Sequence, residues 1–91
     1  MVAESPEHRI KRLLMRSMRR GIKEMDLILH GFATAQLAGM DGASLALYDD
    51  LLEENDHDIY AWINGQMPPP AVYAGLISQI AAGAQGVVRP R

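Results

Sequence analysis

The sequence predicts an all-α protein, a compact bundle of five short helices in one domain. Apolar residues recur at helical spacing in five stretches, breaks containing Gly, Pro or Asn-Asp separate them, and no stretch alternates like a β-strand. Of the 91 residues, 48% are hydrophobic and 22% charged, so the chain is too apolar to be disordered and long enough for one core.

The first two helices flank Gly21. Ser5 as N-cap and Pro6 at the first helical position predict where the first helix begins. Its predicted apolar face comprises Ile10, Leu13, Leu14 and Met18. The second helix follows Gly21, and we expect Gly31 to bend or weaken it without ending it. Its predicted apolar face comprises Ile22, Met25, Leu29 and Phe32, broadened by Leu27 and Ile28.

A glycine-containing break at residues 39–42 precedes the third helix, with Asp41 placed to cap it. The apolar face of this helix comprises Leu45, Tyr48, Leu51 and Leu52, and its solvated face comprises Asp49, Asp50, Glu53 and Glu54. Asn55 is expected to end it, and Asp56 to cap the next helix. Four methionines are expected to fill irregular gaps in the core, namely Met15, Met18, Met25 and Met40.

The fourth helix is short, with Ile59, Trp62 and Ile63 on its buried side, and it ends at Gly65 before the Pro-rich turn at residues 68–70. The last helix has an apolar face of Tyr73, Leu76, Ile77 and Ile80. The helical domain is predicted to span residues 8–82. Residues 1–7 and 83–91 are predicted to be flexible.

Charge is distributed unevenly along the chain. Seven of the nine basic residues precede position 24, and seven of the eleven acids lie between positions 41 and 58. Such separation predicts either a polarised surface that steers a charged partner or two ordinary solvated helix faces. The basic first helix also leaves open an adaptor that binds proteins or nucleic acid. The pI of about 5.8 and the acidic third helix argue against nucleic-acid binding, because a net negative charge and a row of carboxylates repel phosphate.

No motif for catalysis or metal binding is present. His8, His30 and His57 lie far apart, and the acidic run at 54–58 has neither the glycine nor the final glutamate of a calcium loop. The serines lie in no nucleophile motif, and the chain has no Cys and no phosphate-binding loop. We therefore expect no enzyme, no bound metal and no cofactor site. Residues 1–6 carry an acid and no apolar run, which argues against a signal peptide or an acid-poor transit peptide. No apolar run reaches membrane-spanning length, so a cytoplasmic protein is expected.

The junction between the first two helices holds the candidate site. Taken locally, Gly21 fits the C′ position of the first helix, with Arg19 and Arg20 near its negative end. Glu24 and Asp26 fit the first turn of the second helix, where acids are favourable. The residues alone are therefore compatible with a purely structural turn.

The pattern Arg20-Gly21-x-x-Glu24-x-Asp26, followed by an apolar run, resembles the signature of the succinate dehydrogenase assembly factor 2 family, also called flavinators. The similarity continues through Leu51-Leu52-Glu53 and Asp56-x-Asp58-Ile59-x-x-Trp62-Ile63 to the turn at 65–68, and it covers most of residues 8–80.

The resemblance implies a five-helix assembly chaperone. It would bind the flavoprotein subunit of succinate dehydrogenase, and in bacteria also that of fumarate reductase, and promote covalent attachment of FAD to a histidine of that subunit. No tightly bound FAD is expected in the chain itself. We take Arg19, Arg20, Gly21, Glu24 and Asp26 as the predicted partner-binding residues. Our hypothesis is that Gly21 permits close backbone approach, Arg20 pairs with a client carboxylate or dipole, and Glu24 orients Arg20.

Overall fold

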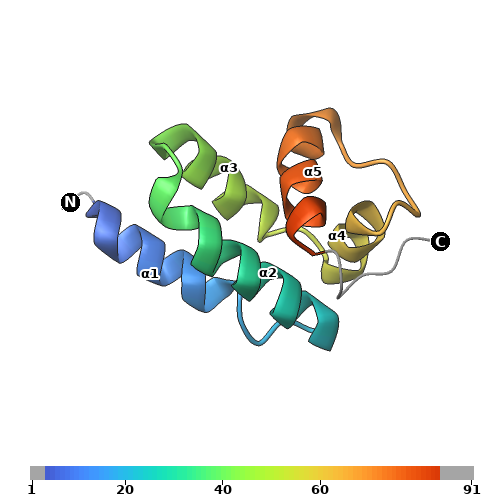
Figure 1. The fold of residues 1–91 in the computed structure, drawn as a ribbon, viewed down its shortest axis with the longest axis horizontal. Helices are drawn as coiled ribbons and strands as arrows, with labels where there is room; N and C mark the ends of the chain where they lie inside the picture. The colour runs from blue at the N-terminus through green and yellow to red at the C-terminus, as the bar shows by residue number, and fades with distance from the viewer. Residues whose placement is uncertain (1–3, 85–91) are drawn as a thin grey trace.

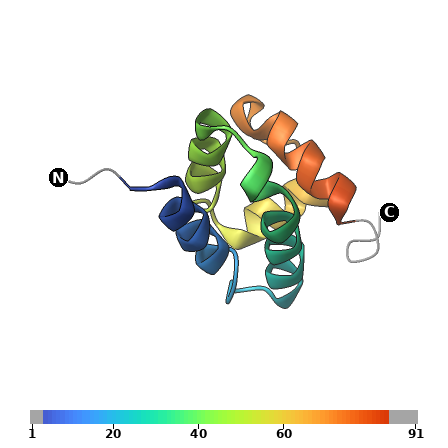
Figure 2. The ribbon, with the colours of Figure 1, turned by 60° about the vertical axis from the view of Figure 1, so that its left-hand side comes forward.

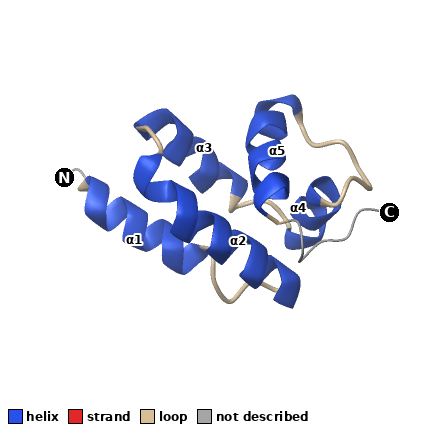
Figure 3. Ribbon diagram, viewed as in Figure 1, coloured by secondary structure: helices blue, strands red, loops and turns tan. Residues whose placement is uncertain are grey.

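The computed structural model describes residues 4–84, which form five α-helices and two short 3₁₀ helices, with no strand in this part of the chain (Figures 1 and 3). The all-α prediction is confirmed. The α-helices are α1 (Pro6–Arg16), α2 (Lys23–Gln36), α3 (Gly42–Leu51), α4 (Asp56–Ile63) and α5 (Ala74–Gly83), and the 3₁₀ helices are η1 (Leu37–Gly39) and η2 (Ala71–Tyr73).

Short-range hydrogen bonds set the helix starts. The Ser5 hydroxyl accepts from the His8 N–H at 3.2 Å, and the Asp41 carboxylate accepts from the Ser44 N–H at 2.7 Å, which lowers the pKa of Asp41. The Ser5 and Asp41 caps are therefore confirmed. The prediction that Asp56 caps α4 is wrong, because Asn55 is the N-cap and Asp56 is the first helical residue.

The ends of the other helices also follow local rules. α2 continues through Gly31 to Gln36, as predicted. Gly65 follows the end of α4 with a φ of +85°, a left-handed conformation that glycine adopts without steric cost. α1 begins at Pro6 and α5 extends to Gly83, so both helices reach into the segments predicted to be flexible. Residues 1–3 and 85–91 of those segments lie outside the described residues.

The core forms around α2, which contacts α1, η1 and α5, while α4 packs on α5 (Figures 1 and 2). Its largest fully buried side chains are Leu13, Met25, Leu29, Leu37, Tyr48, Leu51, Ile59 and Ile80. Trp62 is buried as predicted, and its ring stacks on Tyr73 with centroids 6.1 Å apart. Each helix therefore contributes to a single apolar interior.

Three apolar residues depart from the predicted core. Met18 lies beyond the end of α1 and is 42% exposed, so its placement on the apolar face of the first helix is wrong. Leu27 is 58% exposed and does not broaden the buried face of α2, and Met15 is 74% exposed. Of the four methionines predicted as filler, Met25 is buried and Met40 is half-buried against the core.

A buried polar contact ties α1 to α3. The Ser17 hydroxyl donates to the Leu13 carbonyl oxygen at 2.7 Å and lies 2.6 Å from the Tyr48 hydroxyl. The Tyr48 hydroxyl also lies 3.4 Å from the Leu29 carbonyl oxygen, which is a second possible acceptor for its single O–H. Burial raises the pKa of Tyr48 to about 12.

Among the described residues, no helix is long and apolar enough to cross a membrane.

Candidate partner-binding surface

Residues 17–22 join α1 to α2 as the blue loop at the lower edge of Figure 1. α1 ends at Arg16, and the Ser17 N–H donates to carbonyl oxygens of the preceding turn. Within residues 4–84, Arg19 is the one non-glycine residue with a positive φ, at 55°, and Gly21 is not left-handed. The prediction that Gly21 is the C′ residue is wrong, because α1 ends well before it and Arg19 adopts the left-handed conformation.

The Arg20 side chain is held inside this junction. Its Nε and Nη2 donate to Asp56 Oδ1 at 2.9 and 2.7 Å, its Nη2 also to the Leu52 carbonyl at 2.9 Å, and its Nη1 to the Arg16 carbonyl at 2.9 Å. These contacts use four of the five guanidinium N–H donors. The Arg20 and Asp56 side chains are only 13% and 16% exposed. Arg20 therefore cross-links the fold rather than projecting toward solvent.

Three helix ends explain why an arginine occupies this position. Arg16 is the last residue of α1 and Leu52 is the C-cap of α3, so their carbonyl oxygens lie at negative helix ends. Asp56 lies in the first turn of α4, where a carboxylate is favourable. One planar cation therefore satisfies two helix C-termini and the acid at one helix N-terminus.

The backbone of the junction is fixed by two carboxylates. Asp56 Oδ2 accepts from the Gly21 N–H at 2.7 Å, and Asp26 Oδ1 accepts from the Arg20 N–H. A Cβ built at Gly21 would lie 3.4 Å from Asp56 Oδ2, an ordinary contact distance. Gly21 itself is exposed, so the outer side of this anchored backbone is open to solvent.

Glu24 does not have the role expected from the sequence. It is exposed, and the Arg20 side chain bonds to Asp56 and to two carbonyl oxygens instead. The hypothesis that Glu24 orients Arg20 is therefore wrong. The physical reason is that a carboxylate from α4, remote in the sequence, reaches the guanidinium through both Nε and Nη2. Among the predicted site residues, Arg19, Gly21 and Glu24 are exposed, and Arg20 and Asp26 are partly buried.

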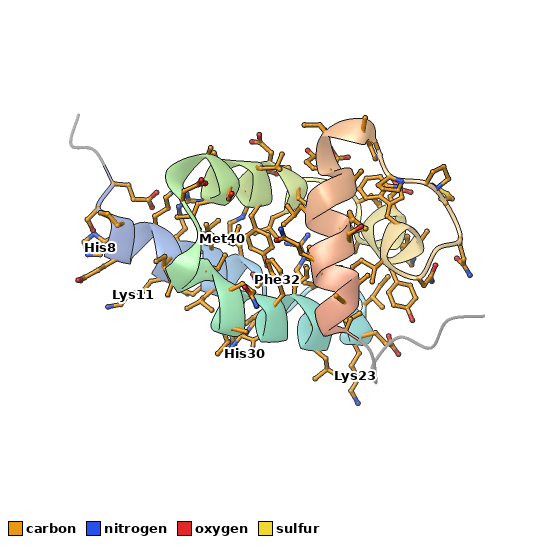
Figure 4. The ribbon with its side chains drawn as sticks, turned by 45° about the horizontal axis from the view of Figure 1, so that its top comes forward. His8, Lys11, Lys23, His30, Phe32 and Met40 are labelled. Carbon is orange, nitrogen blue, oxygen red and sulfur yellow. The ribbon has the colours of Figure 1, made fainter. Side chains whose placement is uncertain are left out.

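A surface pocket of about 310 Å³ lies beside the junction. Its lining combines apolar and charged side chains from the loop and from the outer face of α2, namely Met18, Arg19, Asp26, Leu27, His30 and Gly31. Figure 4 shows the His30 and Lys23 side chains projecting from α2 away from the body of the protein. The pocket therefore adjoins the predicted site and shares Arg19 and Asp26 with it.

The basic and acidic helices pair with each other. Arg12 binds Glu4 at 2.7 Å and Asp49 at 2.9 Å, while Arg16 binds Asp49 and, at 3.1 Å, Glu53. The hydrogen bond from Arg12 holds the pKa of Asp49 below its usual range and also lowers that of Glu4. The basic and acidic segments of the sequence therefore form ion pairs with each other in an α1–α3 network. Arg12 and Arg16 are then not free to bind the phosphates of a nucleic acid.

The described residues contain no group of three or more His, Cys, Asp or Glu side chains that could hold a metal ion. His8, His30 and His57 are each exposed and lie on different helices. The fold and the junction together define a small all-α domain whose α1–α2 loop is held by internal hydrogen bonds and exposes its outer side to solvent.

The chain belongs to the family described as "Flavinator of succinate dehydrogenase", whose family model matches residues 11–84. It is similar to proteins named succinate dehydrogenase assembly factor 2, mitochondrial, from Candida glabrata (45% identity, covering 68% of this chain and 40% of the relative) and Drosophila grimshawi (43% identity, covering 71% and 46%). It is 37% identical to succinate dehydrogenase assembly factor 2-A, mitochondrial, from Drosophila yakuba, covering 97% of this chain and 58% of the relative. The chain thus spans about half the length of these relatives.

The expectation of a cytoplasmic protein is contradicted by these comparisons. The curated relatives are named as mitochondrial assembly factors, so they point to the mitochondrion instead. The inference failed because it rested on the composition of the first few residues and on the lack of a membrane-spanning apolar run, and neither feature identifies the compartment.

Sequence reasoning places the candidate site in the loop between α1 and α2, and it does not predict the positions of three side chains in or beside that loop. It assigns Asp56 to helix capping, although the place of this residue in the resemblance to the family is a signal for a wider role. It also assigns Met18 and Leu27 to the core. No sequence signal separates these two exposed side chains from buried ones, because both fit a helical apolar pattern.

Proposed function

We propose that this chain is an assembly chaperone that binds the flavoprotein subunit of succinate dehydrogenase and promotes covalent attachment of FAD to a histidine of that subunit. Membership of the family described as "Flavinator of succinate dehydrogenase" supports a role in flavin attachment. The observation that carries the proposal for this chain is the junction itself. Asp56 anchors both Arg20 and Gly21, while the outer side of Gly21 and the side chains of Arg19 and Glu24 are exposed.

The five predicted partner-binding residues have two different roles, direct contact with the client and support of the contact surface. Arg19, Gly21 and Glu24 are exposed and meet the client directly. Arg20 and Asp26 support that surface, because Asp26 accepts from the Arg20 N–H and the Arg20 guanidinium reaches three helix ends. A rigid surface loses little conformational entropy when a partner binds, which favours affinity.

The chain acts without catalytic residues of its own. The bond between flavin and histidine forms inside the client, and the chaperone favours the client conformation in which the two are in position. It binds no FAD tightly when isolated. Binding and flavinylation therefore both depend on the exposed side of the junction.

Purified client subunit lacking covalent flavin, incubated with FAD with and without this chain, tests the proposal. Covalent flavin fluorescence after denaturing electrophoresis is expected to rise only when the chain is present. Gly21→Arg is expected to retain helical circular dichroism and to lose this effect. Gly75→Arg is the matched control, because Gly75 lies in α5 and a Cβ added there would have no neighbouring atom within 4 Å.

Two results would contradict the proposal. One is the same flavin attachment with and without the chain. The other is normal flavinylation by a folded Gly21→Arg variant, which would place the contact surface elsewhere. The flavoprotein subunit of fumarate reductase is a second proposed client, and the same assay with that subunit measures it.

A further inference from the structure

The lining of the pocket beside the junction includes two exposed apolar side chains and a cation, together with Asp26, His30 and Gly31. Met18 is 42% and Leu27 58% exposed, and Arg19 belongs to the same lining. Burying a Leu or Met side chain is favourable in water, so their exposure marks a surface suited to contact. The apolar lining comes from two different segments, the loop and α2, that the fold brings together.

We propose that this pocket receives an apolar side chain of the client flavoprotein, and that Arg19 pairs with a carboxylate adjacent to that side chain. This inference rests on the proposed function and extends it to the chemistry of the segment that is recognised. A volume of about 310 Å³ is at the lower end of small-molecule sites, and it suits a side chain better than a dinucleotide cofactor.

The positive charge of Arg19 is the reason for proposing a carboxylate next to that apolar side chain of the client. Among the described residues, Arg19 and Lys23 take part in no ion pair, whereas Arg12, Arg16 and Arg20 are each paired with a carboxylate. The Asp26 carboxylate, which also lines the pocket, accepts a hydrogen bond from the Arg20 N–H. The cation that remains available at the pocket is therefore Arg19, and a client carboxylate complements it.

The backbone at Arg19 supports a contact role. A left-handed conformation is costly for a residue with a side chain, and glycine would avoid that cost. This chain has an arginine at a position whose local geometry favours glycine, and that arginine lines the pocket. Strain of this kind is common where a side chain is presented to a ligand.

Affinity for the FAD-free flavoprotein subunit of succinate dehydrogenase, measured by calorimetry, tests the pocket. Leu27→Ser and Met18→Ser are each expected to weaken binding by about 10-fold or more, since each removes apolar surface that the complex buries. Val72→Ser is the matched control, because Val72 is 63% exposed and lies in η2, outside the pocket lining. It is expected to change the affinity by less than about 2-fold.

Arg19→Gly tests the charge while preserving the backbone conformation. We expect weaker binding at low salt and a smaller dependence of affinity on salt concentration, because one charge pair is lost. Circular dichroism and thermal melting establish that each variant is folded. FAD alone, titrated into the unaltered chain, is expected to give no heat of binding.

The outcomes separate the pocket from the proposed function. If the unaltered chain binds the subunit and promotes flavinylation, while Leu27→Ser and Met18→Ser bind as tightly as Val72→Ser, the pocket proposal is overturned and the function stands. If the unaltered chain does not bind the subunit, both are overturned. Binding of FAD alone that Leu27→Ser abolishes would show that the cofactor occupies the pocket instead, and would also overturn the proposal.

Discussion

The Asp56 carboxylate accepts hydrogen bonds from both the side chain of Arg20 and, at 2.7 Å, the backbone N–H of Gly21. Its Oδ1 accepts from the Arg20 guanidinium, and its Oδ2 accepts from the Gly21 N–H. The first turn of α4 thereby fixes the loop between α1 and α2, although 36 residues separate Arg20 from Asp56.

Asp56→Ala is expected to destabilise the protein by about 2 to 3 kcal/mol, because it leaves a largely buried guanidinium without its carboxylate. Urea unfolding followed by circular dichroism measures this change. Asp58→Ala is the matched control, since Asp58 is an exposed acid in the same helical turn, and its removal is expected to cost under about 1 kcal/mol. Equal losses would show that Asp56 acts only on the helix dipole.

Gly21→Ala is expected to change the free energy of unfolding by less than about 1 kcal/mol, because Gly21 is not left-handed and an added Cβ meets Asp56 Oδ2 at 3.4 Å. The comparison is Gly65→Ala, where a φ of +85° makes a side chain strained and a loss of about 1 kcal/mol or more is expected. A larger loss at position 21 than at position 65 would contradict the unstrained backbone at Gly21.

Arg19→Gly is expected to raise the free energy of unfolding by about 0.5 kcal/mol, since glycine adopts a φ of 55° without steric cost. Lys23→Gly, at an exposed position in the first turn of α2, is expected to lower it by up to about 1 kcal/mol, because glycine is a poor helix former. Thermal melts of the two variants measured side by side provide the comparison. A lower melting temperature for Arg19→Gly would mean that its side chain contributes to the fold.

Stability is expected to fall above pH 10 because of Tyr48. Burial raises the pKa of Tyr48 to about 12, so the unfolded chain loses this proton near pH 10 while the folded protein retains it. The contribution of Tyr48 is therefore fully present below pH 10 and is lost progressively between about pH 10 and pH 12, by roughly 2 kcal/mol.

Tyr48→Phe separates this titration from other alkaline effects. The variant is expected to lose about 1 kcal/mol at pH 7 with the hydrogen bond to Ser17, and to show a shallower decline between about pH 10 and pH 11.5. Urea midpoints across this pH range measure both effects. An identical decline in both proteins would assign the alkaline loss to other groups.

Acid is expected to weaken the α1–α3 network through Asp49. Its pKa is lowered in the folded protein, chiefly by the hydrogen bond from Arg12. The contribution is therefore present above the unfolded value of about 3.9 and is lost as pH falls through the lower folded value. Asp49→Asn is expected to cost only about 1 kcal/mol at pH 7, because the ion pair with Arg12 is partly exposed. The cost is expected to be smaller at pH 3, where the contribution of the carboxylate is being lost.

Asp50→Asn is the control for this network, because Asp50 is exposed and belongs to none of the ion pairs among the described residues. Urea unfolding at the two pH values is expected to show little change for this variant. Equal effects of the two substitutions at pH 7 would mean that the network adds no stability beyond general charge balance.

Short-range physics made much of the fold predictable. Ser5, Asp41 and Gly65 act within three or four residues of the helix ends that they define, so their roles can be read along the chain. The buried faces of α2 and α5 follow helical spacing for the same reason. The residues of the family pattern are close together in sequence, so the pattern assigns the candidate site to a single loop.

By itself, the sequence therefore determined the fold class, several helix limits and the main core. The tertiary structure alone decided that Arg20 binds Asp56 rather than Glu24, that Arg12 and Arg16 bind Asp49, and that Leu27 faces solvent. Caps and helical periodicity depend on neighbours one turn away. Ion pairs and the exposure of an apolar side chain depend instead on how helices from distant parts of the chain pack together.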